Sequence, residues 1–159
     1  MSRRARAPKR AALPDPKFGS DMLAKFINMM MNRGKKSVAE RIVYGAIDRI
    51  SDRNKVSEEQ ALELLAQALD NVKPAVEVKS RRVGGATYQV PVEISKNRQL
   101  ALALRWLVNY STARKGIRLQ RALAIELMEA FNGQGSAVKK RDDTHKMAQA
   151  NKAFAHYAW

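Results

Sequence analysis

The chain has 159 residues, among them 30 Lys and Arg, 15 Asp and Glu and no Cys, which gives a formal net charge of +15 at pH 7. The lack of Cys excludes disulfides, thiolate catalysis and zinc–thiolate sites. So large a positive charge repels itself unless a polyanion neutralises it, which makes nucleic acid the expected partner and an anionic membrane surface the alternative. No apolar run approaches the ~18 residues of a membrane-spanning helix, and we expect no membrane partner.

The N-terminal segment, residues 1–19, lacks any helical pattern. Residues 1–14 contain basic residues but no acid, and prolines stand at positions 8, 14 and 16. Pro and Gly interrupt regular secondary structure. We therefore predict an extended basic N-terminal arm over residues 1–19 that phosphate contacts would order.

Three helices are predicted after the arm. Apolar residues recur at helical spacing in three segments, residues 23–31, 38–50 and 62–72. Ser20 is a candidate N-cap for the first helix. Ser37 with Glu40, and Ser57 with Gln60, are capping-box patterns that predict where the second and third helices begin.

The clearest β signal lies in residues 74–91, directly after Pro74 ends the third helix. Two partly alternating runs flank Gly84-Gly85, and a Gly-Gly pair supplies the positive φ angles of a tight hairpin turn. An isolated two-stranded ribbon is only marginally stable in water. We expect packing at its base and a ligand at its tip to hold it.

Helical spacing returns after the ribbon. Residues 100–108 and 119–128 predict a fourth and a fifth helix, and Ser136 is a candidate cap for a last helix that runs towards Met147. A domain typically contains roughly 100–200 residues. The sequence therefore predicts a single domain over residues 1–159. The fold class is mainly α, with about six helices forming a helical body and one protruding basic β-hairpin.

Basic and acidic residues are segregated along the chain. No acid lies between Glu93 and Glu126, whereas acids cluster in residues 48–70. We expect one side that binds RNA and another, built from the acidic stretch, that faces away from it. The alternative for any single basic run is a solvated surface.

The candidate RNA-binding residues lie in the arm, before the second helix where backbone N–H groups favour an anion, on the slim ribbon, and around the start of the fifth helix. They are Arg3, Arg4, Arg6, Lys9, Arg10, Lys35, Lys36, Lys79, Arg81, Arg82, Tyr88, Arg114, Lys115, Arg118 and Arg121.

No catalytic or metal-binding motif is evident. His145 and His156 are the only histidines, and neither lies in a metal-ligand or nucleophile motif. Asp142 and Asp143 are near His145 in sequence, but no partner pattern for hydrolysis or phosphoryl transfer accompanies them. We expect no enzyme activity, no cofactor and no metal.

Four stretches in the same order resemble the bacterial-type small ribosomal subunit protein seven family, also called the universal ribosomal protein seven family. These are residues 13–18, 34–40, 76–91 and 137–141, the last followed by residues 151–157. The ribbon stretch is the most specific of them.

The resemblance implies a protein of the cytoplasmic ribosome that binds a multi-helix junction in the 3′ major domain of small-subunit rRNA and nucleates assembly of the head. It implies contacts with neighbouring small-subunit ribosomal proteins and a place near exit-site tRNA and mRNA. The ribbon tip and the last helix would face the exit site, and that helix adds four candidate residues, Lys139, Lys140, Arg141 and Lys146.

The competing interpretation is an architectural DNA-binding protein with basic β-arms on a helical body. Such arms insert an apolar wedge between base steps. Here the predicted tip is Gly84-Gly85, without a wedge. The sequence therefore favours a ribbon that lies in an RNA groove.

Overall fold

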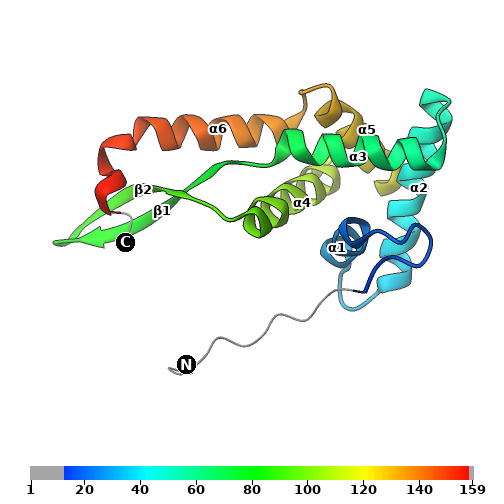
Figure 1. Ribbon diagram of the computed structural model, residues 1–159, viewed down its shortest axis with the longest axis horizontal. Helices are drawn as coiled ribbons and strands as arrows, with labels where there is room; N and C mark the ends of the chain where they lie inside the picture. Colours follow the sequence, from blue (N-terminus) through cyan, green and yellow to red (C-terminus); the bar gives the residue numbers. More distant parts are fainter. Residues whose placement is uncertain (1–12, 158–159) are drawn as a thin grey trace.

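The computed structural model describes residues 13–157 and is mainly helical, with one two-stranded antiparallel hairpin (Figure 1). The elements are α1 (Asp21–Met30), α2 (Lys36–Asn54), α3 (Glu58–Val72), β1 (Val76–Val83), β2 (Ala86–Glu93), α4 (Lys96–Ala113), α5 (Leu119–Phe131), α6 (Ser136–Ala150) and the 3-10 helix η1 (Lys152–Tyr157). The predicted fold class is confirmed, and η1 is an addition to it. Within residues 13–157, no helix combines the length and the apolar character that crossing a bilayer requires.

Helix α5 lies at the centre of the helical body and packs against α2, α3 and α4. Its Leu123 is fully buried and belongs to one continuous hydrophobic cluster with Phe26 of α1, Ile47 of α2, Leu65 of α3 and Leu104 of α4. Burying each side chain of this kind contributes about 1.5–3 kcal/mol. One core therefore holds the first five helices together.

Two of the three N-terminal caps predicted for the first three helices are present in the structure. The Ser57 side chain accepts a hydrogen bond from the backbone N–H of Gln60, whose own side chain accepts one from the backbone N–H of Ser57, so this capping box is confirmed. Ser20 caps α1 as predicted. The capping box at Ser37 is wrong, because α2 already begins at Lys36, so Ser37 lies inside the helix, and the N-cap Lys35 makes no side-chain cap hydrogen bond.

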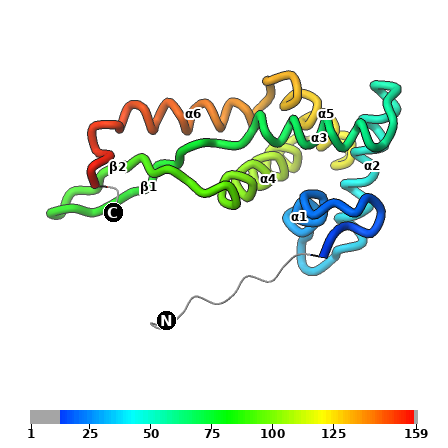
Figure 2. Tube along the Cα trace, in the orientation of Figure 1, coloured from blue at the N-terminus to red at the C-terminus, as the bar shows by residue number. Residues whose placement is uncertain are grey.

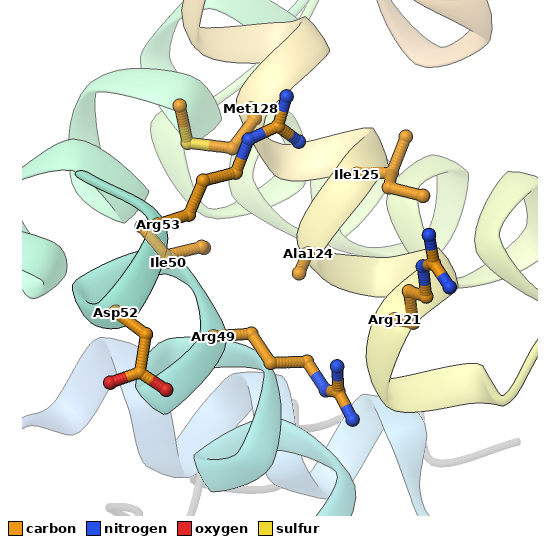
Figure 3. Close-up of a pocket in the computed structure, with 8 residues that line it drawn as sticks. All are labelled: Arg49, Ile50, Asp52, Arg53, Arg121, Ala124, Ile125 and Met128. Atoms are coloured by element: carbon orange, nitrogen blue, oxygen red, sulfur yellow. The ribbon is translucent and has the colours of Figure 1, made fainter.

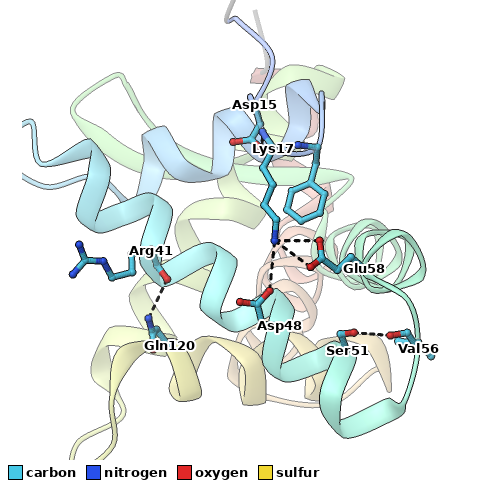
Figure 4. A network of polar contacts seen from close by, with 9 residues as sticks. Asp15, Lys17, Arg41, Asp48, Ser51, Val56, Glu58 and Gln120 are labelled. Atoms are coloured by element: carbon cyan, nitrogen blue, oxygen red, sulfur yellow. Dashed lines mark hydrogen bonds and ion pairs between the residues drawn. The ribbon is translucent and has the colours of Figure 1, made fainter.

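Residues 15–19 form a turn, which differs from the extended arm expected over residues 1–19. The Asp15 carboxylate accepts hydrogen bonds from two backbone N–H groups in this turn and from the hydroxyl of Tyr44, at 2.6 Å. Burial and the bond to Asp15 raise the pKa of Tyr44 above its ordinary value. Lys17 then pairs with Asp48 at 3.8 Å and with Glu58 at 3.1 Å (Figure 4). The segment is thereby fastened to α2 and α3.

The ribbon leaves the helical body at one end, with α6 running alongside it and η1 turning back towards it (Figure 2). Gly84 and Gly85 have φ angles of 57° and 91°, and Val83 pairs directly with Ala86, so two residues close the hairpin as predicted. The left-handed region is accessible to Gly without a steric penalty. The ribbon is consequently not an isolated hairpin.

A buried carboxylate organises the junction of α4, α5 and α6. Glu126 is 0% exposed and accepts hydrogen bonds from the Arg114 guanidinium and from the backbone N–H of Ala137. The predicted cap at Ser136 is wrong, because the N-cap is Gly135 at φ 92°. A Cβ at Gly135 would lie 3.0 Å from the Cβ of Glu129, so both the angle and the space favour glycine.

The capping box at Ser57 and its absence at Ser37 give a matched pair of variants. We expect Ser57→Ala to lower the free energy of unfolding by about 1 kcal/mol, because the backbone N–H of Gln60 at the start of α3 loses its acceptor, the Ser57 hydroxyl. We expect Ser37→Ala to have little effect, since its side chain caps nothing. Denaturant unfolding of both variants measures the difference, and equal losses would contradict the assignment.

Candidate nucleic-acid interface

The ribbon presents its basic residues on both faces. Arg81 lies opposite Tyr88 and Arg82 opposite Thr87 in the antiparallel register. Because side chains alternate between the faces of a strand, Arg82 lies on the face away from Tyr88. Arg82 is exposed, which suits contact with a phosphate.

The Tyr88 ring has partners within the chain that the sequence analysis missed. Its centroid lies 5.1 Å from that of Phe154 and 5.4 Å from that of Tyr157, both in η1. Tilted rings at this separation add favourable energy beyond their burial. Tyr88 therefore fixes η1 to the ribbon, and its side chain is half-buried. Its partners are more than sixty positions away in sequence, so no local pattern could have indicated them.

Polar contacts hold the ribbon where it leaves the body. The Glu77 carboxylate is 3.1 Å from the Lys79 ammonium and 3.2 Å from the Arg98 guanidinium of α4. Burial raises the pKa of Glu77, but hydrogen bonds from Lys79 and Arg98 outweigh this and hold it below the ordinary value of 4.5. His145 of α6 accepts a hydrogen bond from the backbone N–H of Ala75 at 3.0 Å. Lys79 is thus a member of an ion pair as well as a candidate RNA contact.

The basic group around the loop before α5 divides into two kinds. Although no acid lies between Glu93 and Glu126 in the sequence, Arg114 bonds the carboxylates of Glu126 and Glu129 across the fold, so it is paired within the protein. The hydrogen bond to Glu126, which outweighs burial, raises the pKa of Arg114. Lys115, Arg118 and Arg121 are exposed.

The other candidates show the same division. Lys35 is exposed at the start of α2, and Lys36 lies 3.8 Å from Glu40 on the surface. Arg141 bonds the adjacent Asp142 and the backbone carbonyl of Asn71, so it ties α6 to α3.

Three lysines of α6 make no ion pair within residues 13–157. They are Lys139 and Lys146, which are exposed, and Lys140, which is half-buried. The candidates Arg3, Arg4, Arg6, Lys9 and Arg10 lie outside the described residues.

Two arginines that the sequence analysis did not select lie near Arg121. Arg49 and Arg53 of α2 line a cleft with Arg121 of α5 (Figure 3). They belong to the stretch 48–70 that was expected to face away from RNA, so this acidic stretch also carries two exposed arginines. Their spacing of four residues, which places both on one helix face, was the available signal.

The described residues do not provide a metal centre. Residues 13–157 contain no group of three or more His, Cys, Asp or Glu side chains that could hold a metal ion. The exposed candidate residues carry cations and hydrogen-bond donors, which suit phosphate oxygens.

Removing Arg114 tests whether it is structural. We expect Arg114→Ala to lower the free energy of unfolding by about 3 kcal/mol, because the buried Glu126 carboxylate loses its charged partner. The adjacent Lys115→Ala should leave stability unchanged, since Lys115 is exposed. Thermal and urea unfolding measure both, and a stable Arg114→Ala protein would show that the ion pair is dispensable.

Glu77 gives a pH test of the ribbon base. Its depressed pKa stabilises the fold fully above pH 4.5, and this contribution is lost as the pH falls through the folded-state value. The stability difference between wild type and Glu77→Gln should therefore shrink below pH 4.5. Urea unfolding of both proteins across pH 3–7 measures this difference in the free energy of unfolding. We expect it to be on the order of 1 kcal/mol, the contribution of a charge-assisted hydrogen bond. Glu93→Gln, at an exposed strand end, is the control and should retain the wild-type pH dependence.

The comparison with known proteins agrees with the four sequence stretches. Residues 2–152 match the family described as Ribosomal protein S7p/S5e. Over the full length of both chains, the protein is 60% identical to the small ribosomal subunit protein uS7 of Xylella fastidiosa (strain M23). It is 58% identical, again over both full lengths, to the proteins of the same name from Stenotrophomonas maltophilia (strain K279a) and Xanthomonas oryzae pv. oryzae (strain PXO99A). Since the match extends over nearly the whole chain, this protein belongs to the S7p/S5e family of ribosomal proteins.

Proposed function

We propose that this chain binds the 3′ major domain of small-subunit rRNA and nucleates assembly of the subunit's head. The coarser assignment follows from the family: the chain is a structural protein of the small subunit in the cytoplasmic bacterial ribosome, and not an enzyme. As such it associates with small-subunit rRNA and with other ribosomal proteins.

The observation that carries the proposal is the division of the cations. Arg114 and Arg141 form ion pairs with carboxylates of the same chain, and Arg141 also donates a hydrogen bond to a backbone carbonyl. Lys35, Arg82 and Lys115 are exposed and make no ion pair within residues 13–157. Charges left without internal partners repel one another until an external polyanion neutralises them. The exposed group therefore supports an rRNA surface.

The proposed surface has four parts within one domain. They are the basic residues of the segment 1–12, the start of α2, the ribbon and the loop before α5. Phosphate contacts of this kind position a protein on folded RNA without reading its sequence.

We place the ribbon tip and α6 next to exit-site tRNA and mRNA. The ribbon and α6 run alongside each other, and the ribbon tip projects beyond the end of α6 (Figure 1). Lys139 and Lys146 are exposed on α6, and Arg82 is exposed near the ribbon tip. One strand of nucleic acid could therefore contact both elements.

A competition experiment separates this proposal from architectural DNA binding. The purified chain should prefer a junction transcript from the 3′ major domain over duplex DNA of equal length. The wedge-free Gly84-Gly85 turn supports this preference, because architectural DNA-binding proteins frequently insert an apolar wedge between base steps. Equal affinity for both would count against the proposal, and absence of the protein from small subunits on sedimentation of cell extract would refute it.

The ribbon cations should contribute to affinity through counterion release. Log affinity should fall linearly with log salt, by roughly 0.7–0.9 per neutralised phosphate. We expect Arg81→Ala/Arg82→Ala to flatten this slope by about one to two units and to weaken binding to most RNA sequences alike. Filter binding of the transcript at several salt concentrations measures the slope.

Thr87→Ala is the matched control, since Thr87 lies opposite Arg82 on the ribbon but carries no charge. It should keep the wild-type slope. An unchanged slope in the double Arg variant would mean that the ribbon makes no phosphate contact in that complex.

A further inference from the structure

A cleft of about 560 Å³ lies between α2 and α5, at the end of the helical body away from the ribbon tip (Figure 1). Three arginines line it together with Asp52 and an apolar group. Figure 3 shows the guanidinium groups of Arg49, Arg53 and Arg121 spaced around the cleft. Its volume lies in the range of about 300–1,000 Å³ that is typical of small-ligand sites.

The three arginines lack acidic partners. None of them makes an ion pair within the described chain, and all three are exposed. The one acid of the lining, Asp52, directs its carboxylate away from the cleft in Figure 3. Like charges that converge without compensation favour an anionic occupant.

The floor of the cleft is apolar. Ile50 and Ala124 are buried, and the half-buried Ile125 and Met128 complete it. The Met128 sulfur is held by the amide of Asn54 at 3.4 Å. An apolar floor beneath a cationic rim suits a ligand with a flat, weakly polar body and an anionic end.

All three rim cations are arginines, which narrows the class of ligand. A guanidinium bonds phosphate through two parallel N–H groups and also stacks on a planar base, neither of which an ammonium can do. Unpaired bases of folded RNA are recognised by such stacking. A nucleotide meets the requirements of both floor and rim, whereas an acidic peptide meets only those of the rim.

The cleft also adjoins the proposed rRNA surface. Arg121 stands in the first turn of α5, three residues after Arg118 in the loop that precedes the helix. RNA that contacts Lys115 and Arg118 would therefore reach the rim of the cleft along α5. This continuity favours RNA as the source of the nucleotide.

We infer that the cleft binds one unpaired nucleotide of small-subunit rRNA, with its base on the apolar floor and its phosphate between Arg49 and Arg121. The inference rests on the proposed function. It adds a contact on α2, within a stretch that is rich in acidic residues.

The test uses the full chain and a transcript of the 3′ major domain that carries 4-thiouridine. The double variant Arg49→Ala/Arg53→Ala leaves Arg121 and the remaining proposed surface intact. It should bind the transcript about tenfold more weakly, the loss expected for bonds of this strength. The wild type should cross-link through the α5 peptide that contains Met128, and the double variant should lose this cross-link. An abasic site at the cross-linked nucleotide should weaken wild-type binding as well.

Arg41→Ala is the matched control, because Arg41 is an exposed arginine of α2 that does not line this cleft. It should keep wild-type affinity and the cross-link, and unchanged thermal unfolding would show that all variants are folded. Wild-type affinity in the double variant, or no cross-link in α5, would overturn the inference and leave the proposed function standing. If the double variant binds the transcript normally but is incorporated into subunits less efficiently, the inference is overturned and the cleft binds a protein partner instead. A wild-type chain that ignores the transcript would overturn both.

Discussion

The buried carboxylate of Glu126 is the constraint on which the arrangement of the second half of the chain depends. A buried charge is tolerated only where partners satisfy it, and here the partners come from two other elements, Arg114 at the end of α4 and the Ala137 N–H at the start of α6. One side chain of α5 thereby determines how α4 ends and where α6 begins. The glycine at 135, at φ 92°, lets the chain turn sharply enough to reach it.

The direction of α6 in turn supports the ribbon. A two-stranded hairpin alone is marginally stable. Here the backbone N–H of Ala75, at the ribbon base, donates a hydrogen bond to His145 of α6. The rings of Phe154 and Tyr157 in η1 pack against Tyr88 of the ribbon. Glu77 adds an ion pair with Arg98 of α4. The ribbon thus extends from the body as a braced element, and its exposed cations are presented in a defined place instead of being spread over many conformations.

The parts of this fold that depend on neighbours in sequence could be predicted, and those that depend on distant partners could not. Apolar spacing located the helices, and Gly84-Gly85 located the hairpin turn, because both signals act within a few residues. The caps at Ser37 and Ser136 were wrong, because the N-caps are Lys35 and Gly135. At the start of α6 the Ala137 N–H is bonded by Glu126 of α5, a partner that no local cap pattern indicates. The carboxylates that hold Arg114 follow it by twelve and fifteen residues, and only the fold brings them together.

Charge counted along a sequence differs from charge displayed on a surface, and α2 shows why. Asp48 and Asp52 are four residues apart, as are Arg49 and Arg53, so each pair forms its own stripe along the helix. Adjacent residues are about 100° apart around a helix of 3.6 residues per turn, so the two stripes point in different directions, although Asp52 still reaches the edge of the cleft that the arginines line. Lys17 neutralises Asp48 on one side, whereas the arginines border α5 on the other. A segment that is acidic in sequence can therefore present a cationic face, and only the packing of α2 against α5 decides where that face lies.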